Sequence, residues 1–381
     1  MLQNDYFYLN CGNPAKRMVS MNASTSQTRR HFLQTAAVAG IGLSLSRTAI
    51  AAPERIKIGQ IGTKHAHAHG KMDAIRKYPD IFEVVGVVEP DSKQRDAVKQ
   101  RKTYQGLKWL SEKELLAVPG LQAVAVETDV RQLVPTGLRC IRAGMHIHLD
   151  KPAGESMSEC RELHAEARNR GLTIQMGYML RYNPAFQFLF DVLKKGWLGE
   201  ITEVTGMMGK KMNDAGRKEL AEFEGGGMFE LACHIIDALV AVLGKPESVT
   251  AFNHRTQPDK DSFADNQMAV FDYRNAIATI RCNHIDPMGF ARRQFNVTGT
   301  QGTLQIQPLE PPKVRLGLDR PQGKFKKAFQ DVPLPKRAGR YDAEFLDLAK
   351  IIRGEKKLAW SHEHDLAVHE AVLRAGGMRV E

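Results

Sequence analysis

Arg55-Ile56-Lys57-Ile58-Gly59-Gln60-Ile61-Gly62 is the stretch of this chain that decides its fold. Apolar residues alternate along it and a glycine ends it, a pattern typical of a strand that leads into a ligand-binding turn. Directly after it we predict a helix over residues 67–77 and a second strand over residues 82–89. The order strand, turn, helix, strand favours a parallel sheet with helices packed on its faces.

The alternation of strands and helices continues along the chain. Apolar runs predict strands over residues 121–126 and 145–149, and the runs between them predict helices over residues 111–118 and 133–143. Because these strands are apolar on both faces, we predict an α/β, Rossmann-like, doubly wound parallel sheet. Ligands of such sheets bind at the carboxyl ends of the strands, so the turn after the first strand is the expected phosphate site.

That turn reads Gly62-Thr63-Lys64-His65-Ala66-His67 and departs from the dinucleotide fingerprint G-x-G-x-x-G. Lys64 replaces the second glycine, where the backbone normally approaches the pyrophosphate. Its side chain either obstructs a coenzyme or offers an ammonium to a phosphate, and the helix that follows still attracts an anion at its N-terminus. Glu89 ends the second strand, where an acidic residue takes the ribose hydroxyls and disfavours a 2′-phosphate. We therefore predict NAD as the cofactor, in preference to NADP.

His65, His67 and His69 form an H-x-H-x-H run in the same segment. In an extended loop the three imidazoles would share a face and would suit a transition metal. The alternative is that they line the cofactor turn and donate hydrogen bonds. We favour the alternative and predict no metal site.

The N-terminal segment has the layout of an export signal. Arg29-Arg30 is followed by an apolar run over residues 35–43 and by Ala49-Ile50-Ala51, which gives basic, apolar and cleavage regions in order. The apolar run is too short for a stable membrane span. The segment resembles a bacterial twin-arginine (Tat) signal, a route that carries folded proteins, although a chance arginine pair before a helix would look the same. We predict Tat export to the periplasm or beyond, with the Tat machinery as a partner.

The composition limits the function classes. The chain is 43% hydrophobic and 25% charged, as is ordinary for a globular protein, and its net charge is +11. The basic residues are scattered and not interleaved with aromatic residues, which argues against nucleic acid and leaves an anionic substrate or the cell surface open. The cysteines after the signal form no C-x-x-C pair, so we predict buried free thiols.

Several later segments carry a family resemblance. Asp150-Lys151-Pro152, residues 177–184, residues 225–237 and residues 299–304 occur in an order and spacing that resembles the Gfo/Idh/MocA family of NAD(P)-dependent sugar and cyclitol oxidoreductases. The resemblance covers about residues 55–378 and implies a second, α+β domain with an open, largely antiparallel sheet. It also implies terminal helices that return to the first domain, and a homo-oligomer formed through the sheet.

We accordingly divide the chain into three parts. These are residues 1–52, an N-terminal extension with the Tat signal; residues 53–176, the NAD-binding Rossmann domain; and residues 177–381, the substrate and oligomerisation domain. Within the last part, residues 209–225 are polar and contain glycines, which suits a substrate lid. Helices are expected over residues 340–353 and about 364–374.

Two segments supply the predicted catalytic groups. On one helix, Glu230, His234 and Asp237 would lie at i, i+4 and i+7 and share a face, so that the carboxylate orients the imidazole as a general acid or base. The family has an aspartate where this chain has Glu230. By resemblance, Lys151 lies beside the nicotinamide, and desolvation would lower its pKa. The alternatives are a capped surface helix with a chance histidine and an ordinary surface lysine.

The remaining predicted site residues follow from the turn, the strand ends and the resemblance. The family's Thr-Pro near the cofactor is Thr128-Asp129 here, so the proline is missing. The predicted cofactor-binding residues are Gly62, Thr63, Lys64, His65, Glu89, Thr128, Asp150 and Lys151, and the predicted substrate-binding residues are Arg181, Tyr182 and Asp237.

The sequence thus predicts an exported NAD-dependent oxidoreductase that acts on a hydroxyl of a sugar, cyclitol or glycoside. Because free NAD is scarce outside the cytoplasm, we expect the cofactor to stay bound and to be recycled, either between two sugars or in redox-assisted cleavage of a glycoside. The altered turn leaves a second hypothesis, a non-catalytic sugar-binding or scaffolding family member with a degenerate cofactor site.

Overall fold

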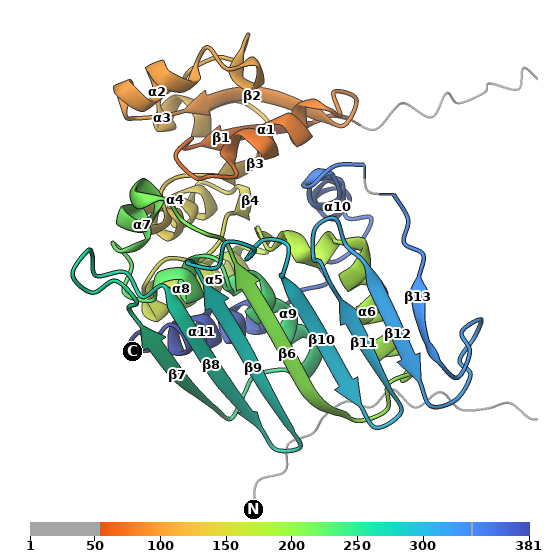
Figure 1. Ribbon diagram of the computed structural model, residues 1–381. Coiled ribbons are helices and arrows are strands. Elements are labelled where there is room, and N and C mark those ends of the chain that lie inside the picture. Colours follow the sequence, from red (N-terminus) through yellow and green to blue (C-terminus); the bar gives the residue numbers. More distant parts are fainter. Residues whose placement is uncertain (1–53, 337) are drawn as a thin grey trace, which may run out of the picture. The chain divides into compact units, whose positions relative to one another are not determined.

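Residues 54–336 and 338–381 are described by the computed structural model, and the predicted export signal lies outside them (Figure 1). Residues 53–381 belong to one compact unit. No helix in the described part of the chain is long and apolar enough to cross a membrane.

Five parallel strands form the first sheet, in the order β2-β1-β3-β4-β5. The strand order reverses at β1, and in sheets of this kind ligands bind where it reverses. The predicted Rossmann-like sheet is confirmed. Its strands are β1 Ile56–Ile61, β2 Phe82–Val88, β3 Leu121–Val126, β4 His146–Leu149 and β5 Ile174–Met176, and its helices are α1 Ala68–Arg76, α2 Ser92–Val98, α3 Glu112–Leu116, α4 Val130–Arg142 and α5 Met157–Arg170.

Local sequence explains where these elements begin. Ser111 and Glu114 form a capping box at the start of α3, and the Asp91 side chain caps α2. The four inner residues of β3, from Ala123 to Val126, are fully buried because helices cover both faces of the sheet.

Eight strands form the second sheet, in the order β13-β12-β11-β10-β6-β9-β8-β7. Its pairs are antiparallel except for β6 and β9, so the predicted open, largely antiparallel sheet is confirmed. The strands are β6 Ile201–Gly209, β7 Ser248–His254, β8 Asn266–Tyr273, β9 Ala276–Asn283, β10 Gln294–Gly299, β11 Gly302–Ile306, β12 Val314–Leu318 and β13 Phe329–Val332.

Helices cover one face of this second sheet (Figure 1). Three of them, α8, α9 and α11, contact the strands β6 to β9. The opposite face has exposed apolar side chains such as Phe252 and Ile277. The helices of this part of the chain are α6 Pro184–Lys194, α7 Asp214–Leu220, α8 Gly226–Glu230, α9 Cys233–Leu243, α10 Asp342–Ile352 and α11 His362–Ala375.

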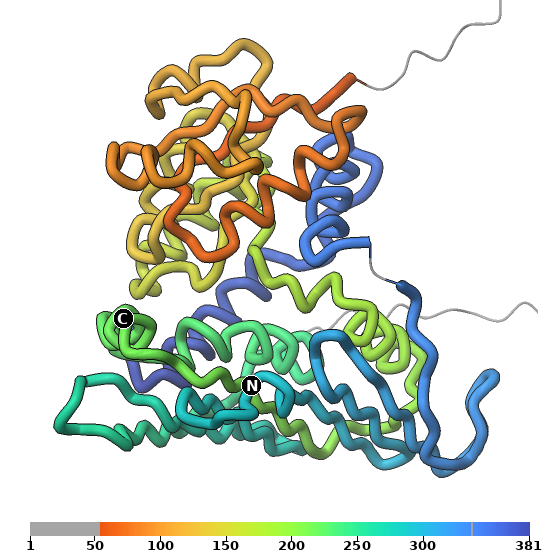
Figure 2. Tube along the Cα trace, turned by 45° about the horizontal axis from the view of Figure 1, so that its top comes forward, coloured from red at the N-terminus to blue at the C-terminus, as the bar shows by residue number. Residues whose placement is uncertain are grey.

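The last two helices contact the first domain. Lys77 of α1 forms an ion pair with Asp342 at the start of α10, and Arg168 of α5 forms one with Glu363 of α11. Figure 2 shows the blue C-terminal segment beside the orange first domain. Residues more than 190 positions apart in the chain are therefore neighbours here.

Two predictions about elements are wrong. The predicted lid loop over residues 209–225 contains helix α7, which the Asn213 side chain caps. The single helix predicted to carry Glu230, His234 and Asp237 is two helices, because α8 ends at Glu230 and α9 begins at Cys233. Several short elements, among them β5, β12 and β13, had not been predicted.

Candidate active site

The first cavity lies at the carboxyl ends of β1, β2 and β3, where the sequence predicted the coenzyme. It has a volume of about 430 Å³. Four of the eight predicted cofactor-binding residues line it: Gly62, Lys64, Glu89 and Thr128. Trp109 and Leu110 add an apolar wall, and Arg95 and Arg139 add cations.

Gly62 makes the turn at the end of β1 possible. Its φ is +89°, and a Cβ there would lie 2.5 Å from the backbone nitrogen of Thr128. Only glycine fits such a close approach of the turn to β3. Glu89 closes the neighbouring strand, and its carboxylate accepts hydrogen bonds from the backbone and hydroxyl of Thr63 and from the backbone of Asp91.

Lys64 neither fills the cavity nor points into the protein core. Its Nζ lies 3.1 Å from Asp91 Oδ2, and nearly half of its side chain is exposed. The hydrogen bond with Asp91 raises the pKa of Lys64, so the ammonium stands at the rim of the cavity. Both hypotheses about this residue therefore stay predictions, since the side chain lines the cavity and its ammonium is held by Asp91.

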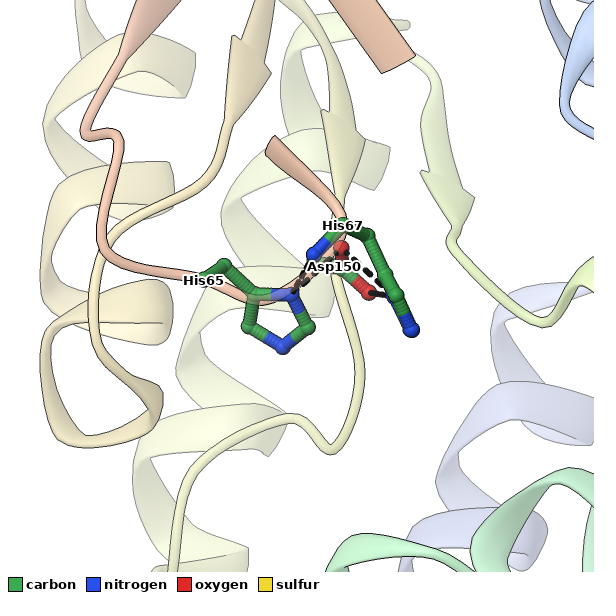
Figure 3. A group of neighbouring side chains, drawn as sticks. All are labelled: His65, His67 and Asp150. Atoms are coloured by element: carbon green, nitrogen blue, oxygen red, sulfur yellow. Dashed lines mark hydrogen bonds and ion pairs between the residues drawn. The ribbon is translucent and has the colours of Figure 1, made fainter. Parts of the chain in front are cut away.

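His65 and Asp150 are buried below the turn and line neither of the cavities described here. His65 Nδ1 lies 2.9 Å from Asp150 Oδ2 (Figure 3). His65 Nε2 lies 3.0 Å from the carbonyl oxygen of Lys151. The backbone amide of Lys151 donates to Asp150 Oδ1 at 2.7 Å. These contacts hold the turn after β1 and the segment after β4 together, so the two residues position Lys151.

His67 belongs to the same cluster but reaches a second cavity. Its Nδ1 lies 3.2 Å from Asp150 Oδ2, while the ring lines the second cavity. Burial lowers the pKa of His67 to about 4, against the opposing effect of Asp150. The third histidine of the run, His69, is exposed on α1.

His65, His67 and Asp150 place their ligand atoms within 4.8 Å of one another, as a metal site would require. Lys71 argues against a cation there, because its Nζ lies 2.8 Å from the same Asp150 Oδ2 that both imidazoles approach. Burial opposes the charge of Lys71, but Asp150 and Glu127 outweigh it and raise the pKa of Lys71 above its usual range. The ammonium already neutralises the carboxylate, so we interpret the cluster as a hydrogen-bonded support.

The second cavity, of about 270 Å³, lies on the other side of the turn. The turn supplies Ala66 and His67 to it, and the segment after β4 supplies Lys151. The second domain supplies all the other groups that line it: Met179, Met208, Lys210, Met212, Leu220, Glu230, Leu231, His234, His284, Phe290, Arg293 and Arg340.

Lys151 is the most buried cation in this cavity, with 1% of its side chain exposed. Its Nζ donates to the Glu230 carbonyl oxygen at 2.6 Å and to Glu230 Oε1 at 2.7 Å. Burial opposes the charge, but the Glu230 carboxylate leads the effects that raise the pKa of Lys151 above its usual range. The prediction that desolvation lowers this pKa is wrong, because the contact with the Glu230 carboxylate outweighs burial.

Glu230 holds Lys151 and makes no hydrogen bond to His234 in the described structure, so its predicted role is corrected. The Ala232 amide donates to the carbonyl oxygen of Gly227, five residues back, where an α-helix would use a residue four back. This wider turn rotates α9 relative to α8, and the i, i+4 relation of Glu230 and His234 is lost. Against burial, Lys151 lowers the pKa of Glu230 to about 2, so a carboxylate faces an ammonium.

His234 lies at the start of α9 and lines the cavity opposite the turn. Its ring centroid is 6.1 Å from that of His67. Nδ1 is buried without a hydrogen-bond partner among the described residues, which leaves Nε2 as the nitrogen that faces the cavity. Burial, with Lys151 as a second cause, lowers the pKa of His234 well below its usual range, so the imidazole is neutral near pH 7.

The structure does not bring the predicted substrate-binding residues into either cavity. Arg181 is 1% exposed and pairs with Asp237 at 2.7 Å and with Asp365 at 2.5 Å. The Tyr182 hydroxyl bonds to Gln175 and to Asp347 instead. These side chains join the domain junction to α9, α10 and α11 and act as structural links.

Two domain models of one protein family match the chain. Residues 56–178 match the model described as the oxidoreductase family, NAD-binding Rossmann fold. Residues 186–305 match the model of the GFO/IDH/MocA C-terminal domain.

Curated proteins match about half of the chain at low sequence identity. The trans-1,2-dihydrobenzene-1,2-diol dehydrogenase of Bos taurus is 28% identical over 199 residues, which are 51% of this chain. The matched part is 58% of that relative, so the chain spans little more than half the length of the curated proteins it matches.

Solved structures share the fold. The WlbA dehydrogenase from Bordetella pertussis, in complex with NADH and UDP-GlcNAcA, has a TM-score of 0.72 at 17% identity, covering 86% of this chain and 96% of that one. An oxidoreductase from Agrobacterium radiobacter, in complex with NAD+, L-tartaric acid and magnesium, has a TM-score of 0.71 at 18% identity, covering 84% and 95%.

Proposed function

The chain belongs to the Gfo/Idh/MocA family of oxidoreductases, and we propose that it oxidises a CH–OH carbon of a sugar, a cyclitol or a glycoside. The observation that carries this proposal is the meeting of a neutral imidazole, His234, and an ammonium, Lys151, in one cavity beside the turn after β1. The bovine relative is named as a diol dehydrogenase, and WlbA is a dehydrogenase in complex with UDP-GlcNAcA, which fits oxidation of a hydroxyl.

The first cavity suits NAD. Gly62 leaves room at the turn where a Cβ would collide with β3, and Glu89 ends β2 with carboxylate lone pairs that can also accept from ribose hydroxyls. A carboxylate at this point disfavours a 2′-phosphate, so we propose NAD over NADP.

Oxidation of a CH–OH carbon releases a hydride from carbon and a proton from oxygen. Bound NAD supplies the acceptor for the hydride. The neutral His234 takes the hydroxyl proton at Nε2. Lys151 uses two of its N–H bonds on Glu230, which leaves a third to donate to the hydroxyl oxygen and to stabilise the negative charge that develops there.

Replacing His234 tests this assignment. We expect His234→Ala to lower the single-turnover rate at which a sugar reduces bound NAD by about 10²–10⁴-fold, the range for a lost acid or base. The amount of bound NAD should not change, because His234 lines the second cavity only. The exposed His254 gives a matched control, His254→Ala. A wild-type rate in His234→Ala would assign the proton to another group.

We further propose that the protein is exported by the Tat route and keeps its NAD bound through a redox-neutral cycle. Heating the purified protein should release NAD in near-stoichiometric amount, measured by absorbance and mass. Release of NADP alone, or of no nucleotide, would contradict the cofactor proposal. Incubation with two sugars, or with a glycoside, then separates transfer between sugars from cleavage of the glycosidic bond by its products.

The export proposal has its own test. Replacing both signal arginines, Arg29→Lys with Arg30→Lys, should leave the protein in the cytoplasm, since the pair is the feature of the segment that resembles a Tat signal. Secretion that is unchanged by the double substitution would rule the route out. A homo-oligomer through the open face of the second sheet stays a prediction, which the mass in solution would check.

A further inference from the structure

The second cavity has an excess of positive charge. Lys151, Lys210, Arg293 and Arg340 line it, and Glu230 is the one carboxylate among its lining residues. Three imidazoles also line the cavity, those of His67, His234 and His284. Burial lowers their pKa values, so they are neutral near pH 7 and do not change this balance of charge. Two of the four cations have their own carboxylates: Lys151 pairs with Glu230 and Arg340 with Glu310.

This pairing leaves two cations, Arg293 and Lys210, and of these Arg293 is buried. It is 4% exposed and sits just before β10. Its Nε donates to the carbonyl oxygen of Gly209 at 2.9 Å, and no carboxylate lies within ion-pair distance of it among the described residues. Burial lowers the pKa of Arg293 and outweighs the opposing effects of Glu310 and Glu230, neither of which forms an ion pair with this guanidinium in the described structure.

The geometry of Arg293 suits an incoming anion. The Phe290 ring lies 4.4 Å from the guanidinium carbon and covers it, while Nε is fixed by Gly209. A guanidinium that is held in this way still presents N–H groups to the cavity, and a carboxylate or a phosphate can accept two of them side by side. Lys210 lines the same cavity, is exposed, and has no carboxylate partner in the described structure.

We do not expect the coenzyme to supply this anion. The proposed NAD site is the first cavity, lined by Gly62 and Lys64, whereas Arg293 and Lys210 line the second. A buried, unpaired charge is costly to keep in a folded protein, so a ligand that neutralises it binds with a large advantage over one that does not.

We propose that the substrate of this site is an anionic sugar, whose carboxylate or phosphate group is bound by Arg293 and Lys210 while its hydroxyl faces His234 and Lys151. This inference rests on the proposed oxidation of a sugar hydroxyl and adds the charge of the substrate to it. It gives the site a specificity element in the second domain that is separate from the groups that take part in the chemistry.

Matched sugars test the proposal with the intact holoprotein. D-glucose, D-glucuronate and D-glucose 6-phosphate share their ring hydroxyls and differ in charge at the sixth carbon. We expect one of the two anionic sugars to half-saturate single-turnover reduction of bound NAD at a concentration at least tenfold below that of glucose. Comparing glucuronate with glucose 6-phosphate tells a carboxylate site from a phosphate site. Equal or better use of glucose would overturn the proposal and leave the proposed oxidation intact.

Substitution of the cations locates the effect. Arg293→Gln should raise the half-saturating concentration of the anionic sugar by about 10–100-fold, the cost of a lost hydrogen-bonded charge, and should raise that of glucose by a clearly smaller factor. Lys210→Gln, at an exposed position that folding tolerates, should act in the same direction to a smaller extent. Arg281 on β9 is exposed, and Arg281→Gln is the control for loss of one positive charge elsewhere. Arg293→Lys keeps the charge and should keep part of the preference.

Direct binding separates this proposal from the proposed function. If no sugar reduces the cofactor, the oxidation proposal fails, and titration calorimetry with glucuronate and glucose 6-phosphate still decides the anion site. Binding that is lost in Arg293→Gln, with Arg281→Gln unchanged, would support the site. No binding of either anion to the wild-type protein, or binding that Arg293→Gln and Lys210→Gln do not change, would overturn it.

Discussion

Among single residues, the contact between Lys151 and Glu230 controls the charge of the site. Burial acts against the charge of each group, since it lowers the pKa of a lysine and raises that of a glutamate. Paired at 2.7 Å, they keep both charges, because the pKa of Lys151 rises and that of Glu230 falls to about 2. Lys151 is thus a fixed hydrogen-bond donor, and the base must be another group.

A prediction for pH dependence follows from this pair. Activity that needs the Lys151 ammonium is lost as the pH rises through its pKa, which lies above the usual range in the wild type. In Glu230→Gln the burial effect acts without its counter-charge, so this pKa should fall below about 10 and an alkaline limb should appear in the rate profile. The measurement is single-turnover reduction of bound NAD between pH 6 and about 10.

The control for this prediction is Glu224→Gln, which removes an exposed carboxylate from the same segment. It should leave the profile as in the wild type. A Glu230→Gln profile that is flat up to about pH 10 would show that Lys151 is not required as a charged donor. Turnover of Glu230→Gln near pH 7 should fall by about 10–100-fold, because the ammonium also loses its fixed position.

Sequence predicted some of these residues for a physical reason and missed others. Lys151 and His234 lie in short contiguous segments whose residue types carry the chemistry, and both line the cavity. Arg293 comes from the loop before β10. Its importance for binding depends on its burial and its neighbours in space, which the local sequence does not indicate. His67 was noted only as part of the histidine run. Its position at the cavity depends on its contact with Asp150, which is distant in the sequence.

Among the elements, helix α9 is held in place by the most extensive buried contacts that bear on the site. Its first eight residues, from Cys233 to Val240, are all buried, and it carries His234. Three residues after His234, Asp237 accepts hydrogen bonds from both Nε and Nη2 of Arg181, and Arg181 also donates to Asp365 of α11. The Trp360 ring covers the guanidinium at 4.6 Å. This buried network fixes the rotation and position of α9 against the domain junction.

Removing the cation from this network should destabilise the protein strongly. Arg181→Met leaves two buried carboxylates without a counter-charge, which costs about 3–5 kcal/mol of the free energy of unfolding. Urea unfolding followed by tryptophan fluorescence measures it, with Trp360 close to the change. The exposed pair Lys195–Asp191 on α6 is the control, since Lys195→Met should cost less than about 1 kcal/mol.

A double substitution checks the mechanism of this loss. Arg181→Met with Asp237→Asn removes one of the two stranded charges, so it should be less destabilised than the sum of the single changes. Additive losses would show that the charges do not act as one network.

The elements that sequence predicted are those with a strong period. Strands such as β8, β9 and β10 alternate between buried and partly exposed residues, which is the period by which a strand is predicted. The break between α8 and α9 has no such signal, because it depends on one hydrogen bond from Ala232 to Gly227. It also depends on the close approach of Gly227 to His284, since a Cβ on Gly227 would lie 2.1 Å from the His284 ring. Helix α7 was missed because its residues are mostly charged or small.

For the molecule as a whole, buried neutral imidazoles are a common feature of both domains. Burial lowers the pKa of His67 and His369 to about 4 and that of His148 and His164 to about 3. The unfolded chain binds these protons near pH 6.5, whereas the folded chain does not until near pH 4 or below. In this window the unfolded state therefore holds more protons, and each such histidine makes the folded state lose stability as the pH falls.

His369 offers the cleanest test of this acid sensitivity. It is 1% exposed on α11, and its ring nitrogens have no well-aligned hydrogen-bond partner among the described residues. His369→Leu removes one proton-binding group at similar volume, so the difference in unfolding free energy between variant and wild type should grow by up to about 1.4 kcal/mol per pH unit from pH 6.5 down to 4. Buried carboxyls with raised pKa values, such as Glu127, act in the opposite direction but cancel in this difference. Urea unfolding at several pH values measures it, and the exposed His254→Leu should show no such trend. A constant difference for His369→Leu would mean that this imidazole is already charged in the folded protein.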